Sequence, residues 1–310
     1  MEKKAPNNRT LTISKDEYQS YKKALLKINE KILSPSQIKN KIINGDTYEI
    51  INYLPTNFVD LLFIDPPYNL SKNYNGNKFE KKTGAGYKKW VEEWLIPLKK
   101  ILKPTASIYI CGYWETSAIL QQICDEHFNL LNRITIERDK GRGSEICWKN
   151  NSEDIWFCSN TKDYYFNADA VKLRRRVIAP YKVNGNPKDW EEQSNQKFRL
   201  TYPSNIWTDI TIPFWSMSEN TPHPTQKPEK LLAKVILASS REGDFIFDPF
   251  GGVGTTAVVA KKLGRNFTCI EKDEEYCIYA QKRLKLAETN KEIQGYSNGV
   301  FLERNAKLTF

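Results

Sequence analysis

The run Val59 to Ile64 (VDLLFI) is almost entirely apolar and stops at Asp65, just before Pro66 and Pro67. An apolar run of this length without alternation is typical of a strand buried on both faces of a parallel sheet. Apolar stretches at 107–111, 245–247 and 266–270 are each followed by apolar residues at helical spacing. Strands that alternate with helices predict an α/β protein with an open, doubly wound, Rossmann-like sheet.

Other segments extend this pattern and divide the chain. Ser14 and Glu17 have capping-box spacing, which predicts a helix over 15–33. We also expect strands at 41–44 and 130–137, helices ending near 54 and 101, helices at 116–128 and 228–240, and a loop at 69–86. Residues 138–220 are rich in Trp, Tyr, Asn, Lys and Arg and show little periodicity, which indicates an insertion. The expected units are 1–36, 37–138, 139–220, 221–290 and a tail at 291–310.

Composition narrows the class of partner. Lys and Arg number 47 against 37 Asp and Glu, so the net charge is +10. This balance indicates a polyanionic partner or simply a basic surface. Six scattered cysteines without a CxxC pair and only two histidines leave no ligand set for zinc, so we expect no metal site. The polar first twenty residues and the absence of a long apolar stretch predict a cytoplasmic protein with no membrane partner.

A glycine-rich turn follows the expected strand 245–247. Glycines in the string from Asp248 to Thr256 (DPFGGVGTT) allow a tight turn and the close approach of a ligand. Glu271 ends the next strand, where a carboxylate can accept hydrogen bonds from ribose hydroxyls. Asp248 would oppose a pyrophosphate, which disfavours a dehydrogenase, but it suits a cationic ligand such as S-adenosylmethionine. The alternative is an ordinary turn between strand and helix.

The string Asp65-Pro66-Pro67-Tyr68 indicates chemistry on a base amine. The prolines remove backbone donors, so the Asp65 carboxylate and the Pro66 carbonyl form a pair of acceptors. Such a pair can hold both hydrogens of an exocyclic NH₂ and turn its lone pair toward a methyl donor. Tyr68 can stack on a base that has been flipped out of the duplex. The alternative is a proline-capped strand end without chemistry.

These motifs resemble those of the amino-methyltransferases that modify adenine N6 or cytosine N4 in DNA. Asp65 to Tyr68 matches their Asp-Pro-Pro-Tyr motif, and Phe250, Gly252 and Gly254 match Phe-x-Gly-x-Gly. The catalytic motif precedes the cofactor motif, which resembles the circularly permuted order of the β-class. The resemblance implies a catalytic half at 37–138, a target-recognition insertion at 139–220 and a cofactor half at 221–290.

The resemblance also implies the site residues. The catalytic ones are Asp65, Pro66, Pro67 and Tyr68. Asp46 matches the position that meets the cofactor adenine, and Thr225 and Lys227, in a block beginning at His223, match contacts to its methionine end. The implied S-adenosylmethionine contacts are Asp46, Asp65, Thr225, Lys227, Asp248, Phe250, Gly252, Gly254, Thr255, Thr256 and Glu271.

The middle of the chain is similar to the second adenine methyltransferases of GATC-type restriction–modification systems. The strings that carry this similarity include Gly141-Arg142-Gly143, 148–151 and 212–217. They imply DNA, duplex or single-stranded, as the partner, with a homodimer and a cognate restriction endonuclease as further associations. The DNA contacts that we expect are Arg142, Lys172, Arg174, Arg175, Arg176 and Lys182. The alternative for the arginine run is a solvated strand edge.

Several functions remain open at this stage. Cytosine N4 methylation uses the same acceptor pair, although Asp at the first motif position favours adenine in this family. A catalytically silent DNA-binding subunit is the alternative of another class. Methylation of RNA or of protein amides is disfavoured, because those relatives usually carry Asn in place of Asp65. Cytosine C5 methylation needs a nucleophilic thiolate, and no Pro-Cys pair is present.

Overall fold

A mixed eight-stranded sheet forms the centre of the computed structural model, which describes residues 5–28, 31–74, 77–138, 145–178, 180–193 and 196–304. The strand order is β1 (Lys41–Asn44), β15 (Asn266–Glu271), β14 (Phe245–Asp248), β2 (Val59–Ile64), β5 (Leu102–Gly112), β7 (Ser152–Ser159), β6 (Asn129–Glu137) and β13 (Ile206–Trp207). β7 runs antiparallel to both of its neighbours, and the other pairings are parallel. The doubly wound α/β fold is confirmed, with one reversed strand.

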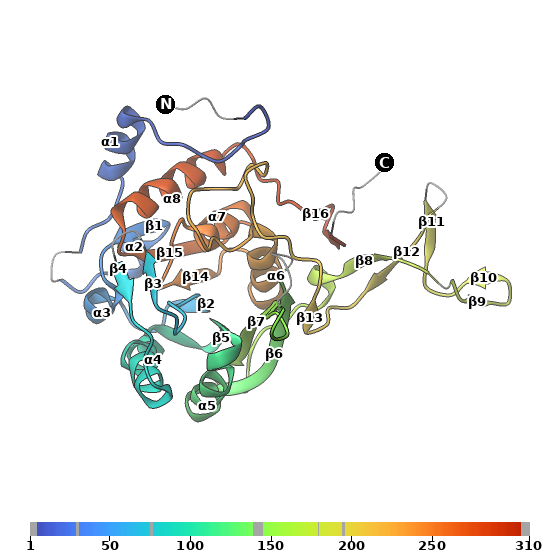
Figure 1. The fold of residues 1–310 in the computed structure, drawn as a ribbon, viewed down its shortest axis with the longest axis horizontal. Helices are drawn as coiled ribbons and strands as arrows, with labels where there is room; N and C mark the ends of the chain where they lie inside the picture. Colours follow the sequence, from blue (N-terminus) through green and yellow to red (C-terminus); the bar gives the residue numbers. More distant parts are fainter. Residues whose placement is uncertain are drawn as a thin grey trace.

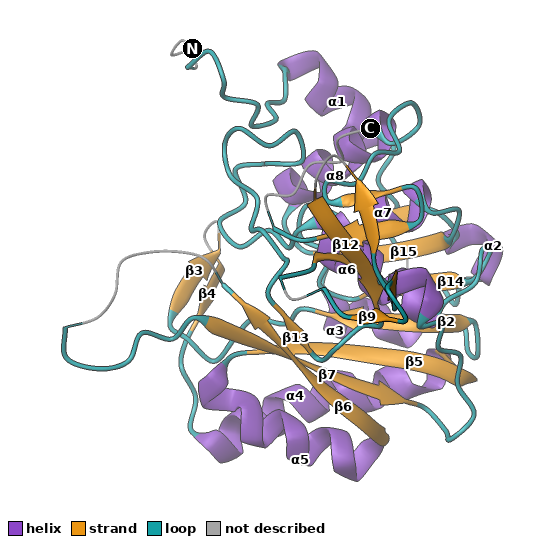
Figure 2. Ribbon diagram, turned by 90° about the vertical axis from the view of Figure 1, so that its right-hand side faces the viewer, coloured by secondary structure: helices purple, strands orange, loops and turns teal. Residues whose placement is uncertain are grey.

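Helices cover both faces of this sheet (Figure 2). α4 (Gly84–Leu98) and α5 (Ser117–His127) lie on one face, and α6 (Glu229–Ser239), α7 (Thr255–Lys262) and α8 (Glu274–Leu286) lie on the other. β2 shows why its sequence is continuously apolar. Leu61 and Phe63 belong to the hydrophobic cluster on the α6–α8 side, whereas Leu62 and Ile64 belong to the cluster on the α4–α5 side. Successive side chains point to opposite faces of the sheet, and both faces are buried. The odd-numbered and the even-numbered residues must therefore both be apolar.

The N-terminal helix is shorter than expected. α1 (Lys15–Lys23) has the capping box of Ser14 and Glu17, but it ends ten residues before the expected 33. Leu26 then forms a bridge to Ile43 of β1, so these residues add to the edge of the sheet instead. The expected helix is wrong beyond Lys23 because backbone pairing with β1 overrides local helical spacing. α1 lies beside α8 in Figure 1.

The remaining short elements connect the main ones. The expected loop 69–86 contains the hairpin β3–β4 and the first turn of α4, and β5 begins at Leu102 rather than at 107. The short elements are α2 (Pro35–Ile38), α3 (Thr47–Ile50), η1 (Ile51–Tyr53), β3 (Lys72–Tyr74), β4 (Asn77–Phe79), η2 (Lys99–Ile101), η3 (Trp114–Thr116) and η4 (Asp169–Val171).

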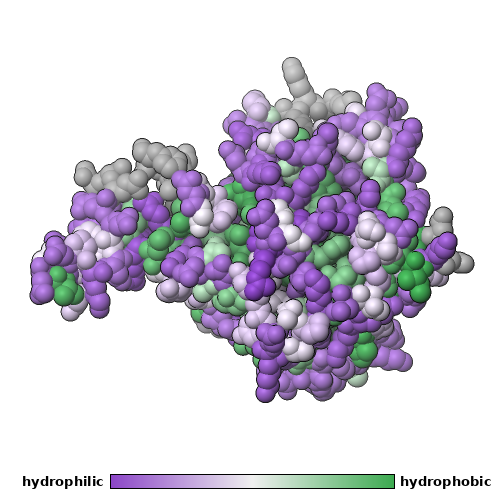
Figure 3. Space-filling model, turned by 180° about the vertical axis from the view of Figure 1, so that it is seen from behind, coloured by the Kyte–Doolittle hydropathy of each residue, from purple (hydrophilic) through white to green (hydrophobic). Residues whose placement is uncertain are grey.

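A second sheet lies beside the first (Figure 1). Residues 173–178, 180–193 and 196–201 project from the rest of the molecule, and we call them the arm. The strand order of the second sheet is β11 (Glu191–Gln193), β12 (Gln196–Thr201), β8 (Leu173–Arg176), β17 (Val300–Leu302) and β16 (Tyr296–Ser297). The hairpin β9 (Lys182–Val183) and β10 (Asn186–Pro187) belongs to the arm. Seen from behind, the arm has a mostly hydrophilic surface (Figure 3).

The expected units are more entangled than the sequence suggested. Residues 139–220 supply β7 and β13 to the central sheet as well as most of the second sheet. Residues 291–310, which we expected to form a tail, supply β16 and β17. Residues 139–220 are therefore joined to the central sheet, because β7 bonds to β5 and β6 on its two sides, and β17 joins the second sheet by pairing with β8. No helix in the described part of the chain is long and apolar enough to cross a membrane.

Candidate active site

The two motif turns meet at one edge of the central sheet. β2 and β14 are parallel neighbours, with Leu62 opposite Phe247. The turns that follow them, at Asp65 and at Asp248, therefore lie side by side although they are far apart in sequence. The strand order reverses here, since the chain passes from β2 outward to β5 in one half and from β14 outward to β15 in the other. Ligands of open α/β sheets bind at such a point.

A cavity of about 310 Å³ occupies this position. It is lined by every expected catalytic residue and by all of the expected cofactor contacts except Gly254. Gly254 is instead the N-cap of α7, at φ 72°, and a Cβ there would lie 2.6 Å from that of Ala280 on α8. The left-handed turn and close helix packing require glycine at this position, and the expected contact with the cofactor stays a prediction.

Asp248 is a buried carboxylate fixed by its own turn. Its Oδ1 accepts a hydrogen bond of 2.9 Å from the amide of Phe250, and its Oδ2 accepts one from the hydroxyl of Thr256. Burial raises the pKa of Asp248 to about 7, against the effect of these two donors. A positive charge placed in the cavity would stabilise the ionised carboxylate and so offset the cost of its desolvation. The site therefore suits a cationic ligand.

Glu271 is held in a similar way across the cavity. Its Oε2 accepts from the amide of Gly252 at 2.8 Å, and its Oε1 accepts from that of Asp273 at 2.7 Å. Burial raises the pKa of Glu271 to about 7. A carboxylate oxygen has more than one lone-pair site, so both oxygens can still accept from ribose hydroxyls. Asp46 caps α3 and pairs with Lys272 at 2.9 Å at the same rim.

Lys227 contacts the turn from Asp65 to Tyr68. Its Nζ lies 2.9 Å from Oδ1 of Asp65 and donates a 3.1 Å hydrogen bond to the hydroxyl of Tyr68. The same Nζ lies 3.5 Å from Oε2 of Glu153 on β7. Lys227 therefore pairs with the carboxylate of Asp65, and its contact with the cofactor, which the resemblance implied, stays a prediction. Sequence reasoning assigned Glu153, in the string 153–157 that shares the similarity to GATC-type enzymes, no role in the site, because only tertiary pairing brings β7 to this edge.

Tyr113 is a second residue that sequence reasoning missed. It follows β5, lines the cavity, and its ring is nearly parallel to that of Tyr68, at 18° with centroids 6.4 Å apart. Two aromatic contacts of about 3.5 Å each need roughly this separation. An aromatic residue directly after a strand that ends at the same edge is the sequence signal that could have identified it.

His223 is a neutral group beside the glycine turn. Its Nδ1 accepts from the amide of Thr225 at 3.2 Å, and its ring packs edge-on against Tyr276 at 4.4 Å. Burial, together with the nearby Lys227, lowers the pKa of His223 to about 4. An uncharged imidazole here does not repel a cationic ligand.

The expected DNA contacts do not form one patch. Lys172 pairs with Asp169 at 2.6 Å, and Arg174 stacks 3.7 Å from the ring centroid of Phe198. Arg175 points the other way, as alternation along β8 requires, and lines a separate cavity of about 380 Å³. Arg176 and Lys182 are exposed. Arg142 lies outside the described residues.

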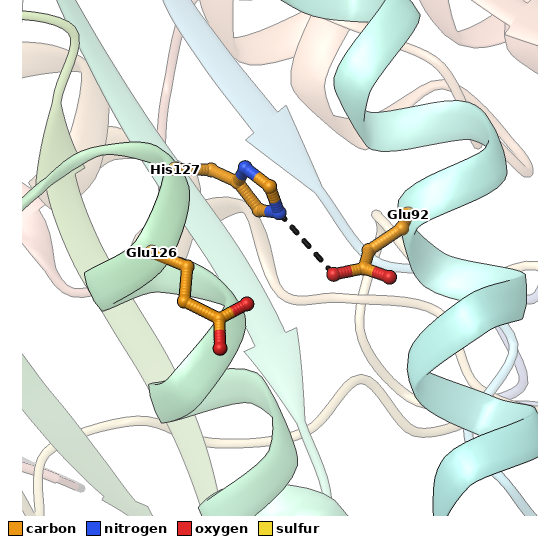
Figure 4. A group of neighbouring side chains, drawn as sticks. All are labelled: Glu92, Glu126 and His127. Atoms are coloured by element: carbon orange, nitrogen blue, oxygen red, sulfur yellow. Dashed lines mark hydrogen bonds and ion pairs between the residues drawn. The ribbon is translucent and has the colours of Figure 1, made fainter.

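One group of side chains in the described ranges has metal-ligand composition, and it lies away from the cavity (Figure 4). Nε2 of His127 on α5 is 3.2 Å from Oε1 of Glu92 on α4, and Glu126 is close to both. Lys88 already supplies a cation, with its Nζ 2.7 Å from Glu126. The group links two helices, and we assign it no ligand.

Comparison with known proteins gives one family. A family model described as DNA methylase, of the N6/N4 methyltransferase kind, matches residues 59–282. The DNA adenine methyltransferase YhdJ of Escherichia coli (strain K12) is 34% identical over 253 residues, which cover 79% of this chain and 83% of that protein. The type II methyltransferase M2.DpnII of Streptococcus pneumoniae is 31% identical over 83% of this chain and 94% of its own length.

Solved structures show the same fold. The PvuII DNA methyltransferase (cytosine-N4-specific) aligns with a TM-score of 0.58 at 18% identity, over 86% of this chain and 95% of that one. A putative DNA modification methylase of Thermus thermophilus, TTHA0409, complexed with S-adenosyl-L-methionine, aligns with a TM-score of 0.55 at 17% identity, over 86% and 99%. At these identities the likeness concerns the fold.

Proposed function

The chain belongs to the DNA methylase family, and we propose that it transfers the methyl group of S-adenosylmethionine to N6 of adenine in DNA. One observation carries the proposal. A single cavity joins a two-acceptor turn, Asp65-Pro66, to a buried carboxylate, Asp248, that suits a cationic ligand. The first feature fits an amine, and the second fits a sulfonium cofactor.

Some residues of the cavity bind the cofactor, and others bind the target base. S-adenosylmethionine supplies an electrophilic methyl group. Glu271 accepts from the ribose hydroxyls, and Asp248 balances the positive charge of the methionine end. Asp65 and the Pro66 carbonyl accept the two amine hydrogens and turn the nitrogen lone pair toward the methyl group. As the new N–C bond forms, the S–methyl bond would break and S-adenosylhomocysteine would leave as a neutral thioether. The amine then carries an extra proton, and the Asp65 carboxylate is the adjacent acceptor for it.

The nearly parallel rings of Tyr68 and Tyr113 provide the two faces of a base pocket. A flipped adenine between them gains stacking of about 1–3 kcal/mol per ring contact. Adenine is supported by Asp65 at the first motif position and by the name of the E. coli relative, a DNA adenine methyltransferase. The likeness to a cytosine-N4 enzyme supports the fold and not the base.

We further propose the associations that such a function needs. The exposed Arg176 and Lys182 of the arm contact DNA phosphates, and residues 139–220 contain the recognition elements. GATC recognition, action on single strands, a homodimer and a partner endonuclease accord with the similarity to restriction–modification enzymes. A cytoplasmic location accords with a DNA substrate.

Mass spectrometry of nucleosides tests the proposal directly. The protein is incubated with S-adenosylmethionine and mixed-sequence DNA, duplex and single-stranded, and the digest is expected to contain N6-methyladenine. Asp65→Ala is expected to abolish transfer while calorimetry shows nearly unchanged cofactor affinity. N4-methylcytosine as the product would overturn the base assignment, and equal loss of transfer and cofactor binding in the variant would make Asp65 structural.

A further inference from the structure

Four charged side chains of alternating sign run from the second half of the central sheet to the catalytic turn. Arg138, just after β6, places Nη1 2.9 Å from Oε1 of Glu153 on β7. The other oxygen of Glu153 lies 3.5 Å from Nζ of Lys227, which lies 2.9 Å from Oδ1 of Asp65. We call these four residues the charge row.

The inner members of the charge row are shielded from water. The side chains of Lys227 and Glu153 are 11% and 13% exposed, and that of Asp65 is 21% exposed. Charges in such surroundings interact more strongly than charges on a surface. A carboxylate in this position without its lysine would be an uncompensated buried charge, which is costly.

We propose that Lys227 and Glu153 are positioning residues for methyl transfer: Lys227 holds Asp65 ionised and oriented through Oδ1, and Glu153 limits how strongly Lys227 does so. The inference rests on the proposed function, because it concerns the acceptor of the amine. Lys227 lies between two carboxylates, so it cannot turn fully to either. The carboxylate of Asp65 can therefore offer its Oδ2 to the amine while Oδ1 stays with the lysine.

The two neighbours act on Asp65 with opposite signs. Burial raises the pKa of Asp65, Lys227 opposes this rise, and Glu153 adds to it. Loss of the lysine charge therefore raises the pKa, and loss of the glutamate charge lowers it. Only the ionised carboxylate accepts both the hydrogen bond and the proton of the amine. The rate of methyl transfer therefore falls at low pH as Asp65 becomes protonated, and we call this fall the acid limb of the rate profile. The acid limb must move with the pKa of Asp65.

Other titratable groups face Asp65, and their protonation must be distinguished from that of Asp65 in the experiment. Burial raises the pKa values of Tyr68 and Cys111 well above their ordinary values, so both stay neutral through the acid limb. Asp248 also senses Asp65, and its pKa lies near 7. Saturation with S-adenosylmethionine places the Asp248 equilibrium in the binding step, so that single-turnover rates report on Asp65.

The experiment is a single-turnover rate profile from pH 5 to 9 with excess enzyme and saturating cofactor. In Lys227→Met the acid limb is expected to move up by about one pH unit, which is a tenfold lower rate below the limb. In Glu153→Gln the limb is expected to move down, and Lys227→Arg is expected to restore the limb toward the wild-type position. Cofactor affinity, measured by calorimetry, is expected to stay within about threefold in all three variants.

A matched control comes from another buried carboxylate. Glu229 pairs with Lys262 at 2.6 Å and with Arg283 at 3.0 Å, its side chain is 6% exposed, and none of the three residues lines the catalytic cavity. Glu229→Gln removes a carboxylate of similar burial, so it reproduces any general loss of stability. Its acid limb is expected to stay at the wild-type pH.

Three results would overturn the proposal. Shifts of the same sign in Lys227→Met and Glu153→Gln would show a general structural effect. An unmoved limb together with lost cofactor affinity in Lys227→Met would make Lys227 a cofactor contact. If the wild-type protein transfers no methyl group, the proposed function fails, and carbon-13 NMR titration of the Asp65 carboxyl, assigned with Asp65→Asn, still tests the charge row. An unchanged Asp65 pKa in Lys227→Met would then refute it.

Discussion

Cofactor affinity should fall steeply as the pH is lowered from 8 to 5.5. Burial holds the pKa values of Asp248 and Glu271 near 7 in the free protein. A bound cation and ribose hydroxyls stabilise the ionised carboxylates, so binding lowers both pKa values. The affinity contributed by these groups is therefore fully present above pH 7 and is lost as the pH falls through 7 and protons compete with the cofactor.

The size of the effect follows from proton competition at a single group. A carboxylate with a pKa of about 7 in the free protein and an ordinary pKa of about 4 in the complex weakens binding about 30-fold at pH 5.5. This factor equals about 2 kcal/mol of binding free energy. A single carboxylate with a free pKa of about 7 can weaken binding by at most about this factor at pH 5.5, and the loss is larger if both carboxylates respond.

Calorimetry at pH 8, 7, 6 and 5.5 measures this dependence. Buffers with different ionisation enthalpies count the protons released on binding, and about one or more is expected at pH 6. S-adenosylhomocysteine, which lacks the sulfonium charge, is the control and should show a weaker dependence. In Asp248→Asn the dependence should flatten while the affinity at pH 8 falls. Affinities that agree within threefold from pH 8 to 5.5 would refute the reasoning about buried carboxylates.

Three further outcomes are expected. Gly254→Ala should destabilise the protein by about 2–5 kcal/mol in urea unfolding, because alanine there has a left-handed φ and a steric clash. The control Gly243→Ala, at φ 84° with open space around it, should lose only about 1–2 kcal/mol. Equal losses in the two variants would show that the clash contributes nothing. Tyr113→Ala should weaken binding of DNA with a flipped base by about 1–3 kcal/mol in fluorescence titrations with 2-aminopurine, and Trp114→Ala, at a side chain 55% exposed, should not. Arg176→Ala should reduce the slope of log affinity against log salt by about 0.9 without changing the methylated sequence; a changed sequence would contradict a phosphate contact.

The central fold could be predicted because its signals are local. The run at β2 is apolar at both parities, the glycine turn lies between β14 and α7, and the Asp-Pro-Pro-Tyr string marks the end of a strand. Parallel strands present their carboxyl ends at one edge, so the meeting of Asp65 with Asp248 followed from the fold class. No contact had to be known in advance for these expectations.

The missed features all depend on contacts between distant segments. Residues 24–28 have helical spacing, but Leu26 pairs with β1 instead. β7 reads as an apolar run, yet nothing in its sequence shows that it reverses direction between β5 and β6. The partner of Lys227 depends on where β7 places Glu153, and local spacing cannot specify that neighbour.

The order of strands in the central sheet also sets when the enzyme becomes complete during its synthesis. β2 and the turn from Asp65 to Tyr68 leave the ribosome early, but the neighbour on one side, β14, begins only at Phe245. The second sheet can be completed only later, because β8 pairs with β17 at residues 300–302. A nascent chain that ends before β14 would carry the Asp65-Pro66-Pro67-Tyr68 string without the glycine turn beside it. The long-range pairings of β2 with β14 and of β8 with β17 predict slow folding relative to proteins of local topology.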